Sequence, residues 1–421
     1  MMRKYTYTLM ICCALLSGLT NCGGGGKSKN ADSTDTSKKN NTEGTANNNE
    51  GEQSSEGGSN SNSNANPKIA EIIKEYCNKL NSYAYTDVKT LFASDVKRYI
   101  GMKNTSNEAI AKEINRFLTT KRFVDYYAEL DQLQVEGKKA TVPININWGN
   151  YQTRMLAEME FNDEHKIVSY NEAKALPLNR KIKTKKKKVV KSYENCNYKS
   201  KKSDCPYMLF DYVKVTQAPS ETLKDSINKK ILDFLGRGTP LGVTKESDLT
   251  KEANRFVKGF ADALKERSAN STWYTNSRLF FREHKNIASI IYMMEGYGGG
   301  AHGFSSAGAA NFDINTGKEL TLDDIMVPDY LPEMKKIATK VFRKLNEIED
   351  GKTISDHGYS MNDNEKFVLA NHFLLEGDHI EFIYNRYEAG PYYLAPPTVR
   401  IKYEDIKHLI KKDGPLGHKI K

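Results

Sequence analysis

The spacing of apolar residues changes from a helical period to a strand period between Pro67 and Ala175. The first part has apolar residues every three or four positions, at Ile69, Ile72, Ile73, Tyr76 and Leu80. This spacing predicts one amphipathic helix. In the later segment ATVPININW, apolar residues alternate with smaller or polar ones from Ala140 to Trp148, which predicts a half-buried strand. A chain with both patterns packs helices against a sheet, so we predict an α+β fold.

The neighbouring segments predict the order of elements in this first domain. A short helix is expected around Val88 and Phe92, and Thr105 with Glu108 indicates a capping box for a third helix. The expected buried face of that helix is Ile110, Ile114, Phe117 and Leu118. MLAEMEF and KIVSYNE predict two further strands. Three helices followed by a curved antiparallel sheet resemble the cone-shaped fold of the nuclear-transport-factor and ketosteroid-isomerase superfamily, and we place this domain at residues 67–178.

The resemblance implies a pocket inside the cone, which some members of the superfamily use for catalysis and others for binding. Asp125, Asp131 or Glu158 would be its candidate acid or base. The residues expected to fill a closed cavity are Phe117, Trp148 and Met155. An open pocket with a desolvated acid beside a tyrosine or histidine would favour an enzyme, and a pocket without an acid would favour a small-ligand carrier.

The N-terminus is typical of a lipoprotein signal peptide. Residues 1–22 combine a basic head, an apolar run and Cys22 as the lipid acceptor. Asn21 stands where a small residue is commoner, so cleavage without lipidation is the alternative. Residues 23–66 are Gly, Ser, Asn, Thr and charged residues, which predicts a disordered tether. We therefore expect a bacterial cell-envelope protein, periplasmic or surface-exposed, held to the membrane by lipid on Cys22.

Three cysteines remain after the signal peptide and the lipid acceptor. Cys77 lies on the apolar face of the first helix and is expected to pack as a small hydrophobe. Cys196 and Cys205 are close in sequence, and a disulfide between them is plausible in an oxidising compartment. Zinc binding is the weaker alternative, because no second pair of ligands stands nearby.

The net charge of +10 is concentrated in one tract. RKIKTKKKKVVK, residues 180–191, holds eight basic residues and no acidic one, so the rest of the chain carries about +2. We interpret residues 179–204 as a solvated basic linker, with contact to anionic lipid headgroups or envelope glycans as the alternative. Nucleic acid is not an expected partner, since no aromatic residues are interleaved to stack bases.

The second half of the chain alternates strand and helix patterns. YMLFDYVKV, RLFFRE, IASIIYMM, HIEFIY and TVRIKY predict strands, with a hairpin turn from His284 to Asn286. Helices are expected from Ser220, around Phe256, around Val341, and at the closing segment EDIKHLI.

These motifs resemble two known modules in family order. CPYMLFDYVKV through SIIYMMEGYGGGAHG is similar to the domain that precedes the deacetylase in PdaC-type peptidoglycan deacetylases, at residues 205–303. NFDINTGKELTLDDI and the last strands resemble the C-terminal domain of RsiV-type anti-sigma factors, at residues 304–412, with a tail at 413–421. The resemblance implies a tandem α+β module with antiparallel sheets. The RsiV-type domain implies binding of lysozyme.

The departures from both families favour a binding module. The sequence shows neither a sigma-binding segment nor a membrane span, and its histidines form no pair at the spacing of a deacetylase metal site. We therefore predict no catalytic residue, metal ion or cofactor.

The glycine-rich segment EGYGGGAHGF is expected to be a structural bend. It lacks the lysine of a phosphate-binding loop, and strand patterns lie on both sides of it. Gly298 to Gly300 would supply backbone geometry that other residues disfavour. His302 would then form a local hydrogen bond or line a groove, while Asp323 and Asp324 are expected to cap a helix.

A tyrosine-rich tract, YNRYEAGPYYLAPP, is the candidate binding surface. The candidate binding residues are Tyr297, His302, Tyr387, Glu388, Tyr392 and Tyr393. The alternative is that these rings only pack their loop onto its own sheet. We expect a non-catalytic envelope protein that binds a lysozyme-like protein or a peptidoglycan fragment, with small-ligand binding or an enzymatic activity in the cone pocket as the alternative.

Overall fold

The computed structural model describes residues 66–82, 85–200, 205–239, 242–266, 272–361 and 366–420. These residues belong to one compact unit that spans 61–421. The expected signal peptide, the expected lipid acceptor Cys22 and the expected tether up to residue 65 lie outside the described residues. In the part that is described, no helix is long and apolar enough to cross a membrane.

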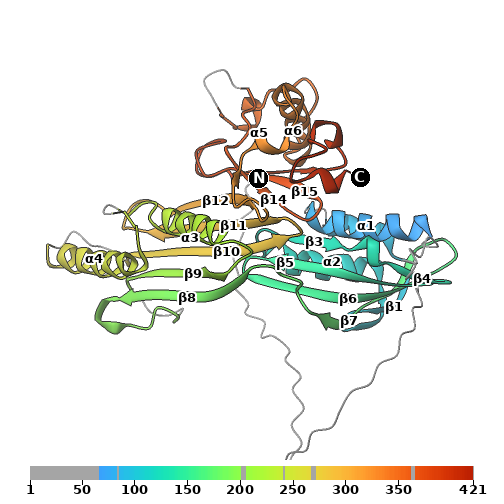
Figure 1. The fold of residues 1–421 in the computed structure, drawn as a ribbon, viewed down its shortest axis with the longest axis horizontal. Coiled ribbons are helices and arrows are strands. Elements are labelled where there is room, and N and C mark those ends of the chain that lie inside the picture. Colours follow the sequence, from blue (N-terminus) through green and yellow to red (C-terminus); the bar gives the residue numbers. More distant parts are fainter. Residues whose placement is uncertain are drawn as a thin grey trace, which may run out of the picture. The chain divides into compact units, whose positions relative to one another are not determined.

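The cone domain begins with the predicted amphipathic helix, α1 (Pro67–Asn81; Figure 1). This helix buries its apolar face. The next element is a 3₁₀-helix, η1 (Tyr85–Leu91), where a short α-helix was expected. A hairpin of β1 (Asp95–Tyr99) and β2 (Met102–Ser106), which the sequence patterns did not predict, then leads to α2 (Asn107–Leu118). The capping box at Thr105 was wrong, because the Ser106 side chain accepts the hydrogen bond from the backbone of Ala109, at 3.2 Å.

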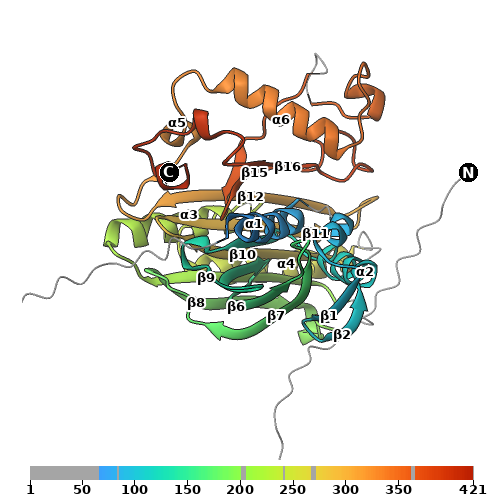
Figure 2. The same cartoon turned by 90° about the vertical axis from the view of Figure 1, so that its right-hand side faces the viewer.

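The cone sheet has seven strands in the order β2-β1-β7-β6-β5-β3, with β4 paired to β5. Its remaining elements are β3 (Asp125–Ala128), η2 (Leu130–Gln132), β4 (Gln134–Glu136), β5 (Lys139–Trp148), β6 (Tyr151–Phe161) and β7 (Ile167–Leu176). The three predicted strands correspond to β5, β6 and β7. The sheet packs against α1 (Figure 2), and η1 and α2 contribute to the same apolar core. This core is the framework of the cone pocket.

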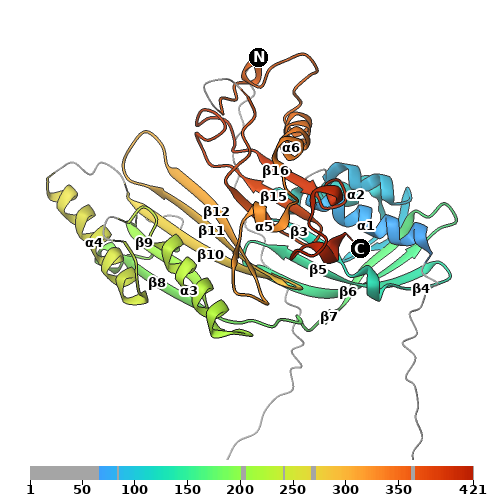
Figure 3. The same ribbon diagram turned by 45° about the horizontal axis from the view of Figure 1, so that its top comes forward.

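A second sheet has six strands in the order β13-β12-β11-β10-β9-β8. Its strands are β8 (Lys183–Ser192), β9 (Tyr207–Gln217), β10 (Tyr274–His284), β11 (Ile287–Tyr297), β12 (Phe304–Asp313) and β13 (Glu319–Leu320). The helices α3 (Glu221–Leu235) and α4 (Glu246–Lys265) cover one face of this sheet (Figure 3). Ser220 is the N-cap of α3, as predicted, and accepts from the backbone of Leu223 at 3.2 Å.

The basic tract is a strand, so its interpretation as a solvated linker was wrong. Residues 183–192 form β8, which pairs antiparallel with β9 along its whole length at the edge of the second sheet. Lysines at a sheet edge discourage pairing with other chains, which is one physical reason for charge on such a strand. A 3₁₀ turn, η3 (Tyr193–Asn195), follows it. The loop to β9 is closed by a disulfide between Cys196 and Cys205, with sulfur atoms 2.02 Å apart.

Two further expectations about this region need correction. The boundary placed between residues 303 and 304 separates β11 from β12, yet these strands pair from Ile287 with Asp313 to Gly296 with Phe304. The two expected modules therefore share one sheet. The sheets are also not purely antiparallel, because β9 pairs parallel with β10, and β1 pairs parallel with β7. The fold is α+β with mixed sheets.

The last part of the chain forms a third sheet with its own core. The order is β14-β15-β16, with strands β14 (His372–Leu375), β15 (His379–Ile383) and β16 (Thr398–Lys402). Its helical elements are α5 (Leu322–Ile325), α6 (Leu331–Leu345), η4 (Ser355–His357), η5 (Lys407–Leu409) and η6 (Gly417–Lys419). The helix α6 packs on β16 (Figure 2). The expected closing helix is only the single turn η5.

Asp324 has the capping role that the sequence predicted. Its carboxylate accepts hydrogen bonds from the backbone and side chain of Thr321, at 3.0 and 2.9 Å, at the start of α5. Lys318 also contacts it at 2.6 Å. Cys77, likewise as expected, is buried in the cone core.

Candidate functional site

The glycine-rich segment is the tight end of the hairpin between β11 and β12. A Cβ at Gly296 would lie 2.6 Å from the carbonyl oxygen of Tyr274, and one at Gly303 would lie 2.8 Å from the carbonyl oxygen of Gly296. Gly299 has a φ of +89°. A Cβ at Gly298 or Gly300 would meet open space. The segment is therefore a bend, but the close approaches occur at its flanking glycines.

His302 lies at this bend and contacts the tyrosine-rich tract. Its Nδ1 is 2.9 Å from the carbonyl oxygen of Gly303, so Nδ1 carries the proton. Nε2 is then an acceptor for the hydroxyl of Tyr387, 3.2 Å away. The imidazole also stacks on Tyr392, with ring centroids 3.8 Å apart. Both ring nitrogens are thus engaged within the fold.

The neighbouring side chains extend this cluster into an exposed patch. The Arg386 guanidinium lies 4.1 Å from the Tyr392 ring centroid and donates to the Tyr392 carbonyl oxygen. Tyr387 is 63% exposed and Tyr393 is 77% exposed. We call the set His302, Arg386, Tyr387, Tyr392 and Tyr393 the aromatic surface.

Tyr387 adopts a backbone conformation that side chains usually avoid. Its φ is +68°, in the left-handed region, which costs an L-residue about 1–2 kcal/mol. Strain of this kind persists only where surrounding contacts hold it, and it concentrates at functional positions. The strained residue is also one of the two most exposed aromatic residues of the patch.

The other predicted binding residues have local roles. The Tyr297 hydroxyl donates to the carbonyl oxygen of Gly300 at 2.8 Å, which holds the bend. The Glu388 carboxylate accepts from the backbone of Asn385 at 2.8 Å and from its side chain at 3.2 Å. Asn385 in turn donates to the Ala307 carbonyl oxygen at 3.1 Å. Tyr297 and Glu388 therefore stabilise the two loops that carry the aromatic surface.

The cone contains an open pocket of about 470 Å³. Its lining is mainly apolar and includes the aromatic residues Tyr76, Tyr99, Phe117, Tyr126, Trp148 and Tyr151. Phe117 was expected to be buried but is 39% exposed, and Tyr151 is 44% exposed. Trp148 stacks on Tyr151, with ring centroids 4.1 Å apart, and so forms part of the wall. Of the two alternatives, an open pocket and a cavity filled by Phe117, Trp148 and Met155, the structure shows the open pocket.

One acidic side chain lines the buried part of this pocket. Glu172 lies on β7, and the hydroxyl of Tyr170 lies 3.4 Å from its carboxylate. Burial raises the pKa of Glu172, and the hydrogen bond from Tyr170 opposes this rise. A second acid, Glu113, also lines the pocket and is paired with Arg116. Tyr170 and Glu172 are two positions apart on a strand, so they share a face, and this spacing was the available sequence signal.

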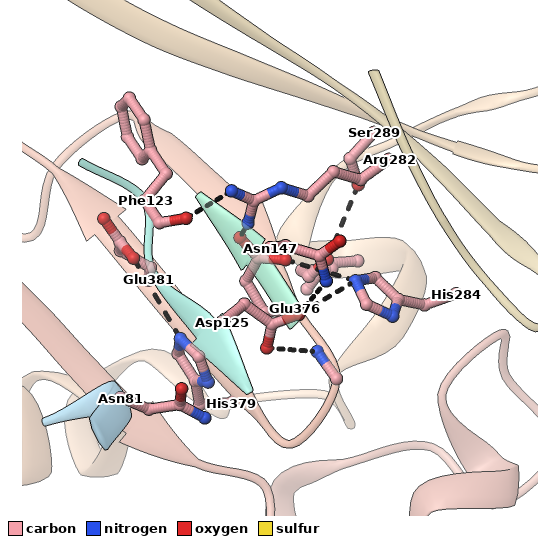
Figure 4. A network of polar contacts seen from close by, with 12 residues as sticks. Asn81, Phe123, Asp125, Asn147, Arg282, His284, Ser289, Glu376, His379 and Glu381 are labelled. Atoms are coloured by element: carbon pink, nitrogen blue, oxygen red, sulfur yellow. Dashed lines mark hydrogen bonds and ion pairs between the residues drawn. The ribbon is translucent and has the colours of Figure 1, made fainter. Parts of the chain in front are cut away.

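The three acids that the sequence nominated for the pocket lie elsewhere. Asp131 borders a different hollow near Lys419, and Glu158 borders a groove on the outer face of β5 and β6. Asp125 is fully buried on β3. It belongs to a network of charged residues that joins the cone to the second and third sheets (Figure 4).

The centre of this buried network is formed by Asp125, Arg282, His284 and Glu376. His284 Nε2 lies 3.4 Å from Asp125 Oδ2 and 3.2 Å from Glu376 Oε2. Arg282 forms an ion pair with Glu376 and donates to the backbone carbonyl of Phe123 (Figure 4). Burial alone would raise the pKa of Asp125, but its interactions with the neighbouring His284, His379 and Arg282 side chains hold it below its usual value. Burial also lowers the pKa of His284 to about 4.

An amide side chain, a backbone N–H group and a lysine complete the network. Asn147 donates to Asp125 Oδ2 at 2.9 Å, and the backbone N–H of Gly377 lies 3.3 Å from Asp125 Oδ1. A Cβ at Gly377 would lie 2.5 Å from the Tyr127 side chain, so the turn before β15 touches β3 closely. Burial lowers the pKa of Lys419 to about 8, and the charge of Asp125 limits this fall.

The network also has the residue types of a metal site. Asp125, His284 and Glu376 place three ligand-type atoms within 4.8 Å of one another, as do Asp125, Asp378 and His379. However, Arg282 already contacts Glu376. The carboxylates are thus compensated by cations of the chain itself, and the arrangement fits a structural ion-pair network. Sequence patterns could not identify this network, because Asp125, His284 and Glu376 come from segments more than 90 residues apart.

The C-terminal part of the chain matches a described family. Residues 323–404 match the model of "Protein of unknown function (DUF3298)", so this part carries a DUF3298 domain. Among curated proteins, the peptidoglycan-N-acetylmuramic acid deacetylase PdaC of Bacillus subtilis (strain 168) is 25% identical over 164 residues. The match covers 38% of this chain and 34% of PdaC, so the chain spans about a third of the length of this relative.

Several solved structures are similar in fold. A DUF3298 family member from Bacteroides fragilis is 21% identical, with a TM-score of 0.46 over 57% of this chain and 97% of that chain. A DUF3298 family protein from Pseudomonas aeruginosa is 22% identical, with a TM-score of 0.41 over 55% of this chain and 96% of that chain. A protein with a ketosteroid isomerase-like fold from Catenulispora acidiphila is 16% identical, with a TM-score of 0.23 over 25% of this chain and 86% of that chain.

Proposed function

We propose that this chain is a non-catalytic, lipid-anchored protein of the bacterial cell envelope, and that its aromatic surface binds a protein or glycan partner. The observation that carries the proposal is the cluster of His302, Arg386 and Tyr392 at the exposed bend, with Tyr387 held in a strained conformation beside it. The lipid would be carried by Cys22. The partner would be a lysozyme-like protein or a peptidoglycan fragment.

The stacked arrangement favours binding because it is rigid before the partner arrives. His302 and Arg386 both pack on the Tyr392 ring, and His302 accepts a hydrogen bond from Tyr387. Large aromatic side chains with polar tips that are already ordered lose little entropy on association. Such residues supply most of the energy at protein interfaces. The exposed rings of Tyr387 and Tyr393 also suit the apolar faces of sugar rings.

The same contacts argue for binding over catalysis at this surface. A general base needs a ring nitrogen that faces the substrate, but Nδ1 of His302 contacts Gly303 and Nε2 contacts Tyr387. The relative PdaC is named as a peptidoglycan deacetylase, and this similarity supports peptidoglycan as one candidate ligand. The RsiV-type resemblance supports a lysozyme-like protein as the other.

Pull-down of the full chain with lysozyme and with soluble muropeptides tests this function. Substituting Tyr387→Ala and Tyr393→Ala together should weaken capture by about tenfold or more, as expected for exposed aromatic anchors. Tyr151→Ala is the matched control, because Tyr151 is a similarly exposed tyrosine on the rim of the cone pocket. Failure of both ligands to bind, or an equal loss in the control, would remove the aromatic surface as the binding site.

Small-ligand binding in the cone pocket is a second candidate function. The observation that favours it is an open pocket of about 470 Å³ that contains a largely buried carboxyl, Glu172, beside Tyr170. The volume lies in the range of small-molecule sites. A carboxyl with a raised pKa beside a tyrosine could transfer protons, so this pocket favours an enzymatic activity over a simple carrier, whose pocket would lack the acid.

Native mass spectrometry of the purified chain tests the cone pocket. A bound small molecule should be lost in Glu172→Gln and retained in Tyr387→Ala. Retention of the molecule in Glu172→Gln and in Trp148→Ala would place it outside the pocket.

A further inference from the structure

The basic tract contributes to a groove that neither proposed site includes. The groove has a volume of about 570 Å³ and lies between the cone and the second sheet. The cone supplies Lys121 and Arg122, which follow α2, and the turn from Trp148 to Asn150. The second sheet supplies Lys186 and Lys188 of β8, with side chains of β9, β10 and β11.

Strand register explains how these side chains reach one face. Lys188 is opposite Asp211 on β9, Asp211 is opposite Arg278 on β10, and Arg278 is opposite Met293 on β11. Residues opposite one another point to the same face of a sheet. The adjacent residues Phe210 and Leu279 belong to the core under α3 and α4. The row from Lys188 to Met293 therefore points away from these helices and into the groove.

The groove carries an excess of positive charge. Its lining contains six basic residues, Lys121, Arg122, Lys186, Lys188, Lys199 and Arg278, but only two acidic ones, Asp211 and Glu295. Both acids form long contacts, Lys188 with Asp211 at 3.8 Å and Arg278 with Glu295 at 3.8 Å. Partly exposed pairs of this kind contribute little. Within the described residues, Arg122 and Lys186 have no acidic group within 4.0 Å.

The tract divides its lysines between two faces of the sheet. Lys187 points to the helix side, where it lies 3.7 Å from Glu246 of α4. Lys186 and Lys188 point to the groove side. Because side chains alternate along a strand, Lys186 and Lys188 add positive charge to the groove, while Lys187 adds it to the face that packs on α4.

Aromatic rings lie among these cations. Trp148 and Tyr198 line the groove. The Lys121 ammonium is 4.4 Å from the Phe117 ring centroid and 6.0 Å from that of Trp148. Lys199 lies 6.0 Å from the Tyr198 ring centroid. Rings can pack on the faces of sugars, while the cations pair with acidic groups.

We propose that this groove binds an acidic sugar polymer, one whose sugars carry carboxylate or phosphate groups. The excess of cations selects for the acidic groups, and the interspersed rings select for sugars. A concave groove between two sheets suits a chain better than a flat membrane surface. The volume is that of a site for a short stretch of such a polymer. None of the six basic residues belongs to the aromatic surface, so the groove goes beyond the proposed function and can fail independently of it.

Isothermal titration calorimetry of the full chain tests this proposal with three probes. Polygalacturonate supplies carboxylates, phosphorylated dextran supplies phosphates, and unmodified dextran is the neutral control. At least one acidic polymer should bind, with an affinity that falls as salt is added, and neutral dextran should not bind. The acidic polymer that binds identifies the acidic group. Binding of neither acidic polymer, or equal binding of neutral dextran, would overturn the proposal.

A matched pair of variants locates the site. Arg122→Gln, Lys186→Gln and Arg278→Gln combined should weaken binding by about tenfold, as expected for three exposed charge pairs. Lys183→Gln, Lys185→Gln and Lys191→Gln combined remove the same number of charges, all from β8, but these residues do not line the groove. This control should bind within about twofold of the unmodified chain. An equal loss in both variants would show attraction by net charge alone and would overturn the groove as the site.

Two further probes exclude other polyanions. Vesicles with anionic headgroups and single-stranded DNA should bind more weakly than the acidic polymer. Stronger binding of either, lost in the groove variant, would overturn the assignment to sugars. Arg122→Gln alone, on the cone side, should weaken binding by about twofold to threefold. Capture of lysozyme should be unchanged in the groove variant, which separates this proposal from the function of the aromatic surface.

Discussion

The buried network and the aromatic surface both join segments that are far apart in the chain. They differ in exposure, because the network buries its polar groups and the aromatic surface leaves its polar groups open to solvent. In the network, Arg282 and Glu376 are each 1% exposed and form an ion pair. In the aromatic surface, Tyr387 and Tyr393 are mostly exposed and the backbone of Tyr387 is strained. The buried network holds the three sheets together. The aromatic surface keeps a rigid face available to a partner.

The largest expected effect is the loss of folding stability when the buried network is disrupted. Arg282→Met leaves Glu376 and Asp125 buried without their nearest guanidinium, and removing one partner of a buried pair costs about 3–5 kcal/mol. The measurement is the free energy of unfolding in denaturant. Arg278→Met is the control, because Arg278 is an exposed residue of the same strand whose contact with Glu295 should contribute about 1 kcal/mol or less. Equal losses in the two variants would refute the structural role of the network.

The next effect is a loss of partner affinity at the aromatic surface. Tyr392→Ala removes the ring on which His302 and Arg386 pack, so partner affinity should fall by about tenfold or more. The loss of folding stability should stay near 1 kcal/mol, because the site is at the surface. Binding assays and unfolding of the same variant measure both quantities. A large loss of stability would place this cluster with the network as a structural element.

The cone pocket lies between these extremes, because the Glu172 carboxyl is largely removed from water and, among the described residues, forms no ion pair. Burial raises the pKa of Glu172 above 4.5. As pH rises above 4.5, the unfolded chain loses the Glu172 proton first, so the folded state loses stability. Glu172→Gln cannot ionise. Its stability relative to the unmodified chain should therefore increase from pH 4 to pH 7.

Glu113 provides a control of opposite sign in the same pocket. Its hydrogen bond and ion pair with Arg116 lower its pKa below 4.5. It therefore contributes stability above pH 4.5 that is lost as pH falls. Glu113→Gln should lose stability relative to the unmodified chain as pH rises from 3 to 5. Identical pH trends in the two variants would contradict the environment assigned to Glu172.

Local patterns in the sequence predicted the elements better than they predicted the contacts between them. Alternation identified β5 and β9, and the capping residue Ser220 identified the start of α3, because each signal lies within a few residues. The basic tract was misinterpreted because pairing with β9 overrides its composition. The short β1–β2 hairpin has few buried positions, so it gave no clear period.

The candidate sites show the same limit. His302 and the tyrosine-rich tract were predicted separately, and the fold brings them into contact. Asp125 was assigned to the cone pocket because it lies in the cone segment of the sequence, yet its side chain contacts His284 and the turn at Gly377. Which face a strand residue occupies depends on what packs against each face, and that information is distributed over the whole chain.

The smallest expected effect tests whether the strain at Tyr387 belongs to binding. Tyr387→Gly removes the steric cost of its φ of +68°, while glycine adds entropy to the unfolded chain. The two terms are of similar size, so the free energy of unfolding should change by less than about 1 kcal/mol. Partner affinity should nevertheless fall, because the ring and its hydrogen bond to His302 are lost. Tyr387→Phe keeps the ring and the backbone strain, so it should retain most of the affinity. If Tyr387→Gly bound the partner as tightly as the unmodified chain, the strained tyrosine would have no part in recognition.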